Sequence, residues 1–320
     1  MTRPFNILVL GGSGFIGRSV CEKLVERANG ASGRIVVPTR NPHRARYLQM
    51  LPTVELVRAD VHDDATLARL LAGCDAVINL VAILHGSEAA FQQVHVDLPR
   101  RLAAACEAAG VRRVVHVGAL GGSPDAPSRY QRSKAAGEAV LKASGLDLTV
   151  LRPSLVFGEH DRFINLFASL QALLPVMALA GADAQFQPVW VEDVAAAIVR
   201  ALDDDRLIGQ TIECTGPEVY ALRQLVAAAG RWSGHPRPVF GLPFALGRLQ
   251  AAMLELLPGA PLMSRDNVDS MRIPNLATGT LPGLASIGIT PAALQPVMRP
   301  LLERRTGVAR LEPYRRAAGR

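Results

Sequence analysis

Short apolar segments alternate with amphipathic segments along the first half of the chain. Near-continuous apolar runs occur at residues 7–10, 35–37, 54–57, 77–83, 114–117 and 148–151. Runs of this kind are typical of strands that are buried on both faces of a parallel sheet. The segments between them, which include residues 65–72, 88–109 and 129–144, have the pattern of crossover helices. The sequence therefore predicts an α/β fold with a doubly wound parallel sheet, Rossmann-like in architecture.

A glycine-rich turn follows the first predicted strand. Gly11, Gly14 and Gly17 have the spacing G-x-x-G-x-x-G, and an amphipathic helix comes next. Glycines at these positions allow a tight turn, a close approach of the backbone to a pyrophosphate, and close packing of the helix on the strand. The helix N-terminus adds unpaired N–H groups and positive dipole. This combination predicts a dinucleotide site.

The residues after the second predicted strand bear on the choice of cofactor. An acidic residue there would bind the ribose 2′-OH of NAD, but the sequence has Arg40, followed by His43, Arg44 and Arg46. A guanidinium can hold a 2′-phosphate through two hydrogen bonds. NADP(H) is therefore the favoured cofactor, and NAD(H) is the alternative. If these basic residues bind no ligand, they form a solvated basic loop.

Asp60 stands at the end of the third predicted strand. Two roles are open for it. Its carboxylate is placed to accept a hydrogen bond from an adenine amino group, or it caps the helix that begins near Asp64.

The helix predicted after the fifth strand contains Tyr130 and Lys134 at positions i and i+4, so both project from one face. A lysine ammonium near a phenol lowers the phenol pKa, which would let Tyr130 exchange a proton with a substrate while a nicotinamide exchanges hydride. The chain has only three lysines, Lys23, Lys134 and Lys142. A chance pairing is therefore less expected here.

Taken together, these motifs resemble the short-chain dehydrogenase/reductase superfamily in its extended and atypical branch. Within it the chain is similar to the accessory subunit of respiratory complex I that has this fold, and to its bacterial and ubiquinone-biosynthesis-associated relatives. The similarity runs through residues 116–138, 151–167, 186–198 and 263–271 and covers nearly the whole chain from residue 6 to about residue 305.

The resemblance implies a tightly held NADPH. The positions that match the family's cofactor contacts are Gly11, Gly14, Gly17, Arg40 and Asp60, with Tyr130 and Lys134 on the nicotinamide ribose side and Pro153 near the carboxamide. Phe15, Ile16, Val61 and Val81 complete the predicted cofactor-binding set. Tyr130 and Lys134 are also the predicted catalytic pair, and no metal ligand is predicted.

One departure from the superfamily bears on mechanism. Its enzymes generally have a Ser or Thr at the end of the fifth strand that hydrogen-bonds the reacting oxygen, whereas this chain has Gly118 and Ala119. Loss of one such donor costs roughly 10² to 10³ in rate. Ser123 and Ser128, in the loop before Tyr130, are the hydroxyls that could substitute.

The regular alternation fails after residue 152, where prolines become denser and helices shorter. We interpret residues 1–152 as an NAD(P)-binding Rossmann domain, residues 153–305 as a smaller, mixed substrate-side lobe with elements that return to the sheet, and residues 306–320 as a basic tail. The apolar segments 163–179 and 240–257 could line a cleft for a quinone, isoprenoid or lipid tail, form a protein interface, or simply pack in a core. Asp161, Arg162 and Asn165 are expected to face the cleft. His95 and His116 are expected to be hydrogen-bonded interior histidines.

The formal net charge of +7 is concentrated near the end of the sequence, where residues 299–320 contain seven arginines and two glutamates. Such a segment can bind acidic lipid headgroups or an acidic protein surface, or be a solvated terminus. It offers one aromatic residue, Tyr314, and no binding module, so nucleic acid is not an expected partner. Four widely spaced cysteines and the lack of a secretory apolar segment suit a cytoplasmic protein, located at most peripherally at the inner face of the membrane.

Two functions remain open on the sequence. The first is an NADP(H)-binding protein linked to complex I or ubiquinone metabolism, in which the nucleotide has a structural or sensing role. The second is an active NADP-dependent reductase, dehydrogenase or epimerase that acts on an apolar carbonyl, a quinone or a nucleotide-sugar, with Tyr130 as general acid/base.

Overall fold

The computed structural model describes residues 5–29, 33–256, 258–259, 261–305, 314 and 317–319. The chain divides into two compact units, each built from separate stretches. The first comprises Met1–Pro153, Val191–Cys214 and Ala277–Thr290, and the second Ser154–Trp190, Thr215–Leu276 and Pro291–Arg320. The boundary predicted after residue 152 is thus one of several points at which the chain passes between the units. The predicted basic tail lies mostly outside the described residues.

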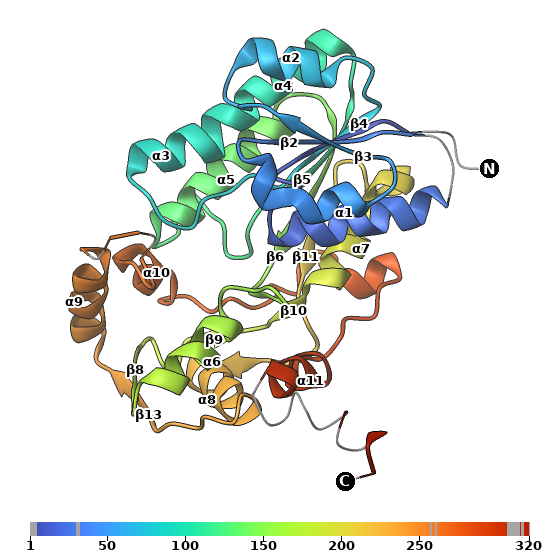
Figure 1. The fold of residues 1–320 in the computed structure, drawn as a ribbon. Coiled ribbons are helices and arrows are strands. Elements are labelled where there is room, and N and C mark those ends of the chain that lie inside the picture. The colour runs from blue at the N-terminus through green and yellow to red at the C-terminus, as the bar shows by residue number, and fades with distance from the viewer. Residues whose placement is uncertain are drawn as a thin grey trace. The chain divides into compact units, whose positions relative to one another are not determined.

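The first unit contains a seven-stranded sheet in the order β11-β6-β5-β4-β1-β2-β3, and all its strand pairs are parallel (Figure 1). The strands are β1 Ile7–Leu10, β2 Ile35–Thr39, β3 Val54–Arg58, β4 Ala76–Asn79, β5 Arg113–Val117, β6 Asp147–Pro153 and β11 Thr211–Cys214. The predicted doubly wound α/β fold is confirmed. The predicted run 77–83 is wrong at its end, because β4 stops at Asn79.

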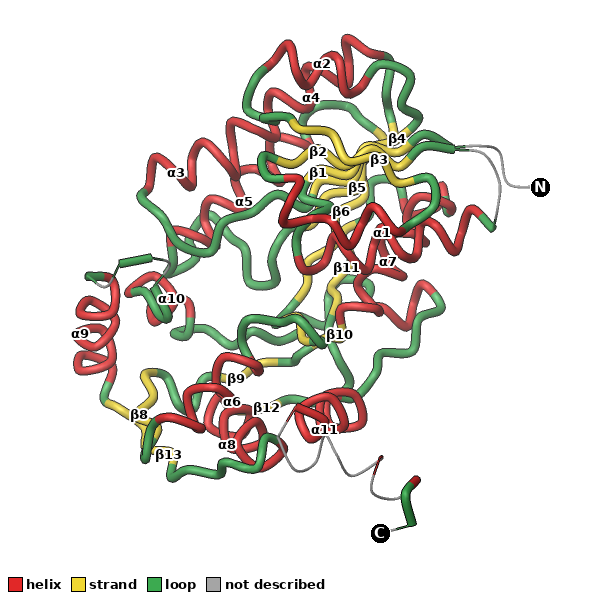
Figure 2. The backbone as a smooth tube through the Cα atoms, viewed as in Figure 1, coloured by secondary structure: helices red, strands yellow, loops and turns green. Residues whose placement is uncertain are grey.

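Helices cover both faces of this sheet (Figures 1 and 2). One layer is formed by α1 Phe15–Ala28 and α7 Val191–Asp203, which pack on each other; the other is formed by α2 Asp64–Leu71, α3 Glu88–Gln92, α4 Leu98–Ala109 and α5 Arg129–Lys142. The helix predicted over residues 88–109 is interrupted by a π-helical turn, Gln93–Asp97. Pro99 explains this, since it has no N–H to donate within the following helix.

An apolar core lies between the sheet and the layer that contains α2 and α4. Leu8 and Leu10 of β1 pack there with Leu67 of α2 and with Leu102 and Cys106 of α4, all fully buried. The four cysteines are free thiols, and burial raises the pKa of Cys106 to about 12. Cys21, Cys106 and Cys214 are buried, and Cys74 is partly exposed.

The unpredicted strand β11 connects the sheet to a returning segment of the first unit. Its buried Glu213 accepts hydrogen bonds from the backbone N–H of Thr278, at 2.7 Å, and from the Thr278 hydroxyl, at 3.1 Å. The Glu213 N–H donates to the carbonyl of Pro282, at 2.9 Å. A buried carboxylate inside a four-residue strand is thus satisfied by a stretch of chain more than sixty residues later.

The second unit surrounds an apolar core of its own, to which α6, α8 and α11 contribute residues such as Phe167, Leu225 and Met298. Its helices are α6 Ile164–Leu173, α8 Leu222–Trp232, α9 Phe244–Glu255, α10 Arg265–Ser270 and α11 Leu294–Arg305. Its strands form three pairs: β7 Val156–Phe157 with β10 Val189–Trp190, β9 Gln185–Phe186 with β12 Tyr220–Ala221, and β8 Met177–Ala180 with β13 Val239–Leu242. Among the helices in the described part of the chain, none combines the length and hydropathy needed to cross a bilayer.

Candidate nucleotide-binding site

The turn between β1 and α1 has the geometry that its glycines predict. Gly11 has a φ of 79°, and a Cβ at this position would lie 3.0 Å from the carbonyl carbon of Leu80. A Cβ at Gly17 would lie 2.5 Å from both the carbonyl oxygen of Gly11 and the Cα of Gly12. Glycine at position 17 therefore allows α1 to start directly against the turn.

The first turn of α1 supplies backbone donors at the end of the sheet. Gly14 is the N-cap residue and offers no side chain, so the N–H groups of the first helical residues have no partner from a capping side chain. Phe15 and Ile16 stand in this turn and are partly exposed. A glycine-lined turn with free N–H donors and a positive helix end fits a pyrophosphate, so these residues would hold that part of a dinucleotide.

Tyr47 supports the glycine turn, a role that no sequence motif indicates. Its hydroxyl donates to the carbonyl oxygen of Ser13 at 2.9 Å, and the guanidinium of Arg18 lies over its ring, 4.7 Å from the centroid. Tyr47 belongs to the 3₁₀ segment Pro42–Met50 that follows β2. This contact links the turn after β1 to the basic segment after β2.

Arg40 and Asp60 stand just beyond the ends of β2 and β3 and are exposed. Because these strands are parallel neighbours, their carboxyl ends meet at the same edge of the sheet as the glycine turn. Asp60 accepts a hydrogen bond from the N–H of His62 at 3.0 Å, whereas α2 is capped by Asp63, which accepts from the N–H of Thr66 at 2.8 Å. The capping role considered for Asp60 is therefore wrong.

Asn79 fixes the loop at the end of β4 and is a second residue that the sequence analysis missed. It is buried; its Oδ1 accepts from the N–H of Val81 at 3.2 Å, and its Nδ2 lies 3.3 Å from Nδ1 of His116. His116 is buried as predicted, and its Nε2 has no hydrogen-bond partner among the described residues. The predicted contact residues Val61 and Val81 are partly buried.

Tyr130 and Lys134 lie in the first two turns of α5. Ser128 caps this helix: its hydroxyl accepts from the N–H of Gln131 at 3.1 Å and donates to Oε1 of Gln131 at 2.8 Å. Ser128 is fully buried. The idea that Ser128 replaces the missing hydroxyl is therefore wrong, because that hydroxyl is committed to the helix end; Ser123 stays a prediction.

Lys134 is only 3% exposed, and its Nζ donates to the carbonyl oxygen of Val117 at 2.6 Å. Burial lowers the pKa of Lys134 to about 8. Burial also raises the pKa of Tyr130 to about 12. The predicted lowering of the Tyr130 pKa by Lys134 is therefore wrong, since desolvation of the phenol is the dominant effect.

His95 positions the helical turn that carries Tyr130. Its Nε2 accepts from the N–H of Ile83 at 3.1 Å, so Nδ1 carries the proton and donates to the hydroxyl of Ser133 at 2.8 Å. Ser133 in turn donates to the carbonyl oxygen of Tyr130 at 2.9 Å. Burial, and to a lesser extent Lys134, lowers the pKa of His95 to about 3. His95 is therefore a neutral, hydrogen-bonded interior histidine, as predicted.

A buried ion pair lies beside the position of the missing hydroxyl. Glu138 of α5 receives two hydrogen bonds from the guanidinium of Arg152, at 2.8 and 2.9 Å, and an ion pair from Lys142 at 2.6 Å. A Cβ at Gly118 would lie 3.2 Å from Oε2 of Glu138 and 3.4 Å from Cγ of Arg152. A side chain at position 118 would thus meet this ion pair.

The remaining candidates have structural partners. The carbonyl oxygen of Pro153 accepts from the N–H of Leu120 at 3.0 Å, which joins the end of β6 to the segment after β5. Asp161 is buried and its Oδ1 accepts from the N–H groups of Phe163 and Ile164, at 2.8 and 2.6 Å, at the start of α6. Asn165 also bonds Asp161. The expectation that Asp161 faces a cleft is therefore wrong; its carboxylate is used to start a helix.

A parallel sheet with a glycine turn, a basic strand end and a Tyr-x-x-x-Lys helix defines a nicotinamide dinucleotide-binding protein of the short-chain dehydrogenase type. The chain belongs to the NAD dependent epimerase/dehydratase family, whose pattern matches residues 7–214. The resemblance inferred from the motifs is thereby confirmed.

Among its relatives is the mouse (Mus musculus) mitochondrial protein NADH dehydrogenase (ubiquinone) 1 alpha subcomplex subunit 9, which is 30% identical over 293 residues, 90% of this chain and 77% of the relative. A ceramide reductase of Caulobacter vibrioides is 29% identical over 195 residues, 60% of this chain and 59% of that protein. An NADPH-dependent quinone oxidoreductase of Escherichia coli, solved with NADPH, has the same fold, with a TM-score of 0.73 and 22% identity over 93% of this chain and 97% of that one.

Proposed function

We propose that this protein holds NADP(H) mainly as a structural or sensing ligand and is linked to respiratory complex I or to ubiquinone metabolism. The observation that carries the proposal is the state of the Tyr130 region. Lys134 donates to a backbone carbonyl, burial raises the pKa of Tyr130 to about 12, and positions 118 and 119 offer no hydroxyl. The parts that bind a nucleotide are intact, whereas the parts that would move a proton are weakened.

In this proposal each part of the site has a binding role. Gly11, Gly14 and the first turn of α1 hold the pyrophosphate, and Asp60 contacts the adenine. When bound, the nicotinamide can supply or accept a hydride. Tyr130, Lys134 and Pro153 hold the nicotinamide half in place. A ligand bound only by the folded state also stabilises that state by mass action, without turnover.

The preference for NADP(H) over NAD(H) rests on Arg40. The end of β2 has no carboxylate to repel a 2′-phosphate, and the exposed Arg44 adds further positive charge nearby. Arg40→Gln is expected to weaken NADPH binding about 10-fold or more while leaving NADH binding nearly unchanged. Calorimetric titration of both nucleotides checks this, with Arg69→Gln as the control because Arg69 is an exposed arginine on α2. An equal loss for both nucleotides would contradict the assignment.

The link to respiration is supported by the mouse relative, whose name places it in an NADH dehydrogenase (ubiquinone) subcomplex and whose sequence aligns with most of this chain. We propose a corresponding partner of the respiratory-complex class, or a quinone or other lipid. The proposed location is cytoplasmic, peripheral at the inner face of the membrane.

The second candidate is an active NADP-dependent reductase, dehydrogenase or epimerase that acts on an apolar carbonyl, a quinone or a nucleotide-sugar. It is supported by the intact Tyr130 and Lys134 pair and by a relative named ceramide reductase. In this case Tyr130 is the general acid/base. Tyr130→Phe is then expected to abolish turnover and to leave nucleotide affinity nearly unchanged.

The deciding experiment identifies the nucleotide released from the purified protein by mass spectrometry and then follows reduced-nicotinamide absorbance of the intact complex after addition of quinones and simple carbonyl compounds. We expect co-purified NADPH that none of these acceptors oxidises. Formation of NADP⁺ after addition of an acceptor would favour the second candidate, and its loss in Tyr130→Phe would assign the catalyst. A site that is purified empty and prefers NADH would overturn the role of Arg40.

A further inference from the structure

Three leucine and methionine side chains of helix α9 in the second unit, and that of its C-cap residue Leu256, are exposed. Leu246, Leu249, Met253 and Leu256 are 53 to 85% exposed. At about 100° per residue, these four positions fall within an arc of about 80°. We name this surface the α9 face. Isolated exposed leucines are ordinary, but a continuous apolar stripe of this kind marks a binding surface.

On the opposite side of α9, two small residues lie where the helix meets β8. Gly247 and Ala251 are buried and lie about 140° and 180° from the centre of the α9 face. A Cβ at Gly247 would come within 2.4 Å of the Cβ of Ala180 in β8, and Gln250 donates to the carbonyl of Ala178 at 3.3 Å. At position 247 there is therefore no room beneath α9 for a larger side chain. The helix cannot rotate to bury the α9 face, which is the reverse of a usual surface helix.

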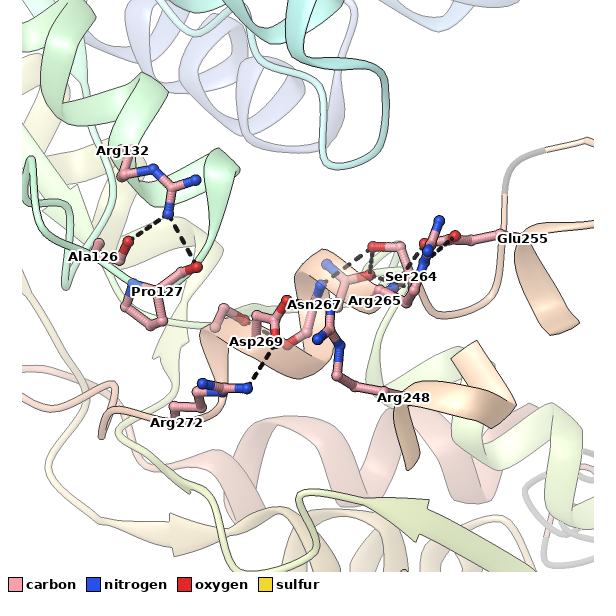
Figure 3. A network of polar contacts seen from close by, with 11 residues as sticks. Ala126, Pro127, Arg132, Arg248, Glu255, Ser264, Arg265, Asn267, Asp269 and Arg272 are labelled. Atoms are coloured by element: carbon pink, nitrogen blue, oxygen red, sulfur yellow. Dashed lines mark hydrogen bonds and ion pairs between the residues drawn. The ribbon is translucent and has the colours of Figure 1, made fainter. Parts of the chain in front are cut away.

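Charged side chains beside α9 form a network of ion pairs (Figure 3). Arg248 pairs with Asp269, and Arg265 pairs with Glu255. Arg272 also pairs with Asp269, and its guanidinium lies over the ring of Phe244. The three arginine side chains are 43 to 54% exposed, whereas the two carboxylates are 18 and 22% exposed. The region therefore presents guanidinium groups to its surroundings next to an apolar stripe.

We propose that the α9 face binds the surface of a bilayer that contains anionic lipids. An apolar helical stripe bordered by exposed arginines can insert its side chains to the level of the acyl chains while the guanidinium groups contact lipid phosphates. A second protein is a poorer fit, because a stable protein interface uses about 20 to 30 residues a side. The α9 face, even with the neighbouring exposed Phe240 and Phe244, is much smaller.

Sedimentation of the full chain with vesicles tests the proposal. Wild-type protein is expected to bind vesicles of phosphatidylglycerol and phosphatidylcholine in equal parts, to bind pure phosphatidylcholine more weakly, and to lose affinity as salt is raised. The double variant Leu249→Gln/Met253→Gln is expected to bind the anionic vesicles about 10-fold more weakly or worse. Met50→Gln is the matched control, since Met50 of the first unit is 85% exposed and lies outside the α9 face.

The basic segment near the end of the sequence is a second possible site for anionic vesicles. The double variant distinguishes binding by the α9 face from binding by this segment, because it changes the α9 face alone. Unchanged vesicle binding by Leu249→Gln/Met253→Gln would overturn the proposal. A wild-type protein that does not bind vesicles, or that forms a dimer which the same substitutions disrupt, would overturn it as well. A dye attached to Met253→Cys is expected to shift to shorter emission wavelengths when anionic vesicles are added, and the same dye on Met50→Cys is not. An unshifted dye at position 253 would also overturn the proposal.

This surface extends the peripheral location proposed above and does not depend on the nucleotide. Bound NADP(H) is measured in the same samples. A wild-type protein that contains nucleotide but does not bind vesicles would contradict only the role of the α9 face. A protein that binds vesicles but no nucleotide would contradict only the proposed nucleotide function.

Discussion

Replacing Glu138 by alanine is expected to lower the free energy of unfolding by about 3 kcal/mol. The carboxylate is buried and receives two hydrogen bonds from Arg152 and one ion pair from Lys142. Its removal leaves the largely covered guanidinium of Arg152 without a counter-charge, and breaking one side of a buried pair costs more than the pair contributes. Urea unfolding followed by circular dichroism measures the change. Glu107→Ala is a suitable control, because Glu107 is exposed on α4.

The pH dependence of the unfolding free energy of Glu138→Gln separates the contribution of the Glu138 charge from that of its side-chain packing. Burial alone would raise the pKa of Glu138, but the hydrogen bonds from Arg152 and Lys142 outweigh it and hold the pKa below its ordinary value of 4.5. A carboxyl with a depressed folded pKa contributes stability above its unfolded pKa and loses it as the pH falls through the folded value. The stability difference between wild type and Glu138→Gln should therefore shrink as the pH is lowered below 4.5. A difference that stays constant across this range would show that shape, not charge, matters at this position.

Gly17→Ala is expected to weaken dinucleotide binding about 100-fold. A methyl group at this position would come within 2.5 Å of the Gly11 carbonyl oxygen and of the Gly12 Cα, both of which are backbone atoms that cannot swing away. Helix α1 must then move outward, and its first-turn N–H groups move with it. Fluorescence titration with NADPH measures the loss.

The control for this variant is Gly283→Ala, where a Cβ has no neighbour closer than 3.8 Å. It should bind NADPH like the wild type. If Gly17→Ala kept nearly full affinity, the donors of α1 would not be the groups that hold the pyrophosphate.

Six strands could be predicted from apolar runs; five of them are mostly buried, whereas β3, at the edge of the sheet, is partly exposed. Strand β11 escaped prediction because Glu213 breaks its short apolar run, and only the distant Thr278 explains how that carboxylate is satisfied. The π-helical turn before Pro99 was missed because residues 88–109 were interpreted as one helix, although Pro99 itself shows that a backbone donor is lacking inside that segment.

The candidate nucleotide-binding residues were predicted largely from local spacing. Gly11, Gly17, Tyr130 and Lys134 belong to short motifs that are visible in the sequence. Tyr47, Asn79 and Glu138 could not be found this way, because each acts through a partner on another element: Ser13, His116 and Arg152. The pKa of Tyr130 was predicted in the wrong direction, since the sequence shows which charge is near but not how far the fold desolvates the phenol.

The late position of strand β11 in the sequence also affects folding during synthesis of the chain. As the ribosome adds residues, β6 is complete by Pro153, but its partner strand emerges only at Thr211–Cys214, and the segment that satisfies Glu213 later still, at Thr278. During that interval the apolar β6 is an open sheet edge, available to other chains. A truncated chain that ends near residue 153 is therefore expected to aggregate through the unpaired edge of β6.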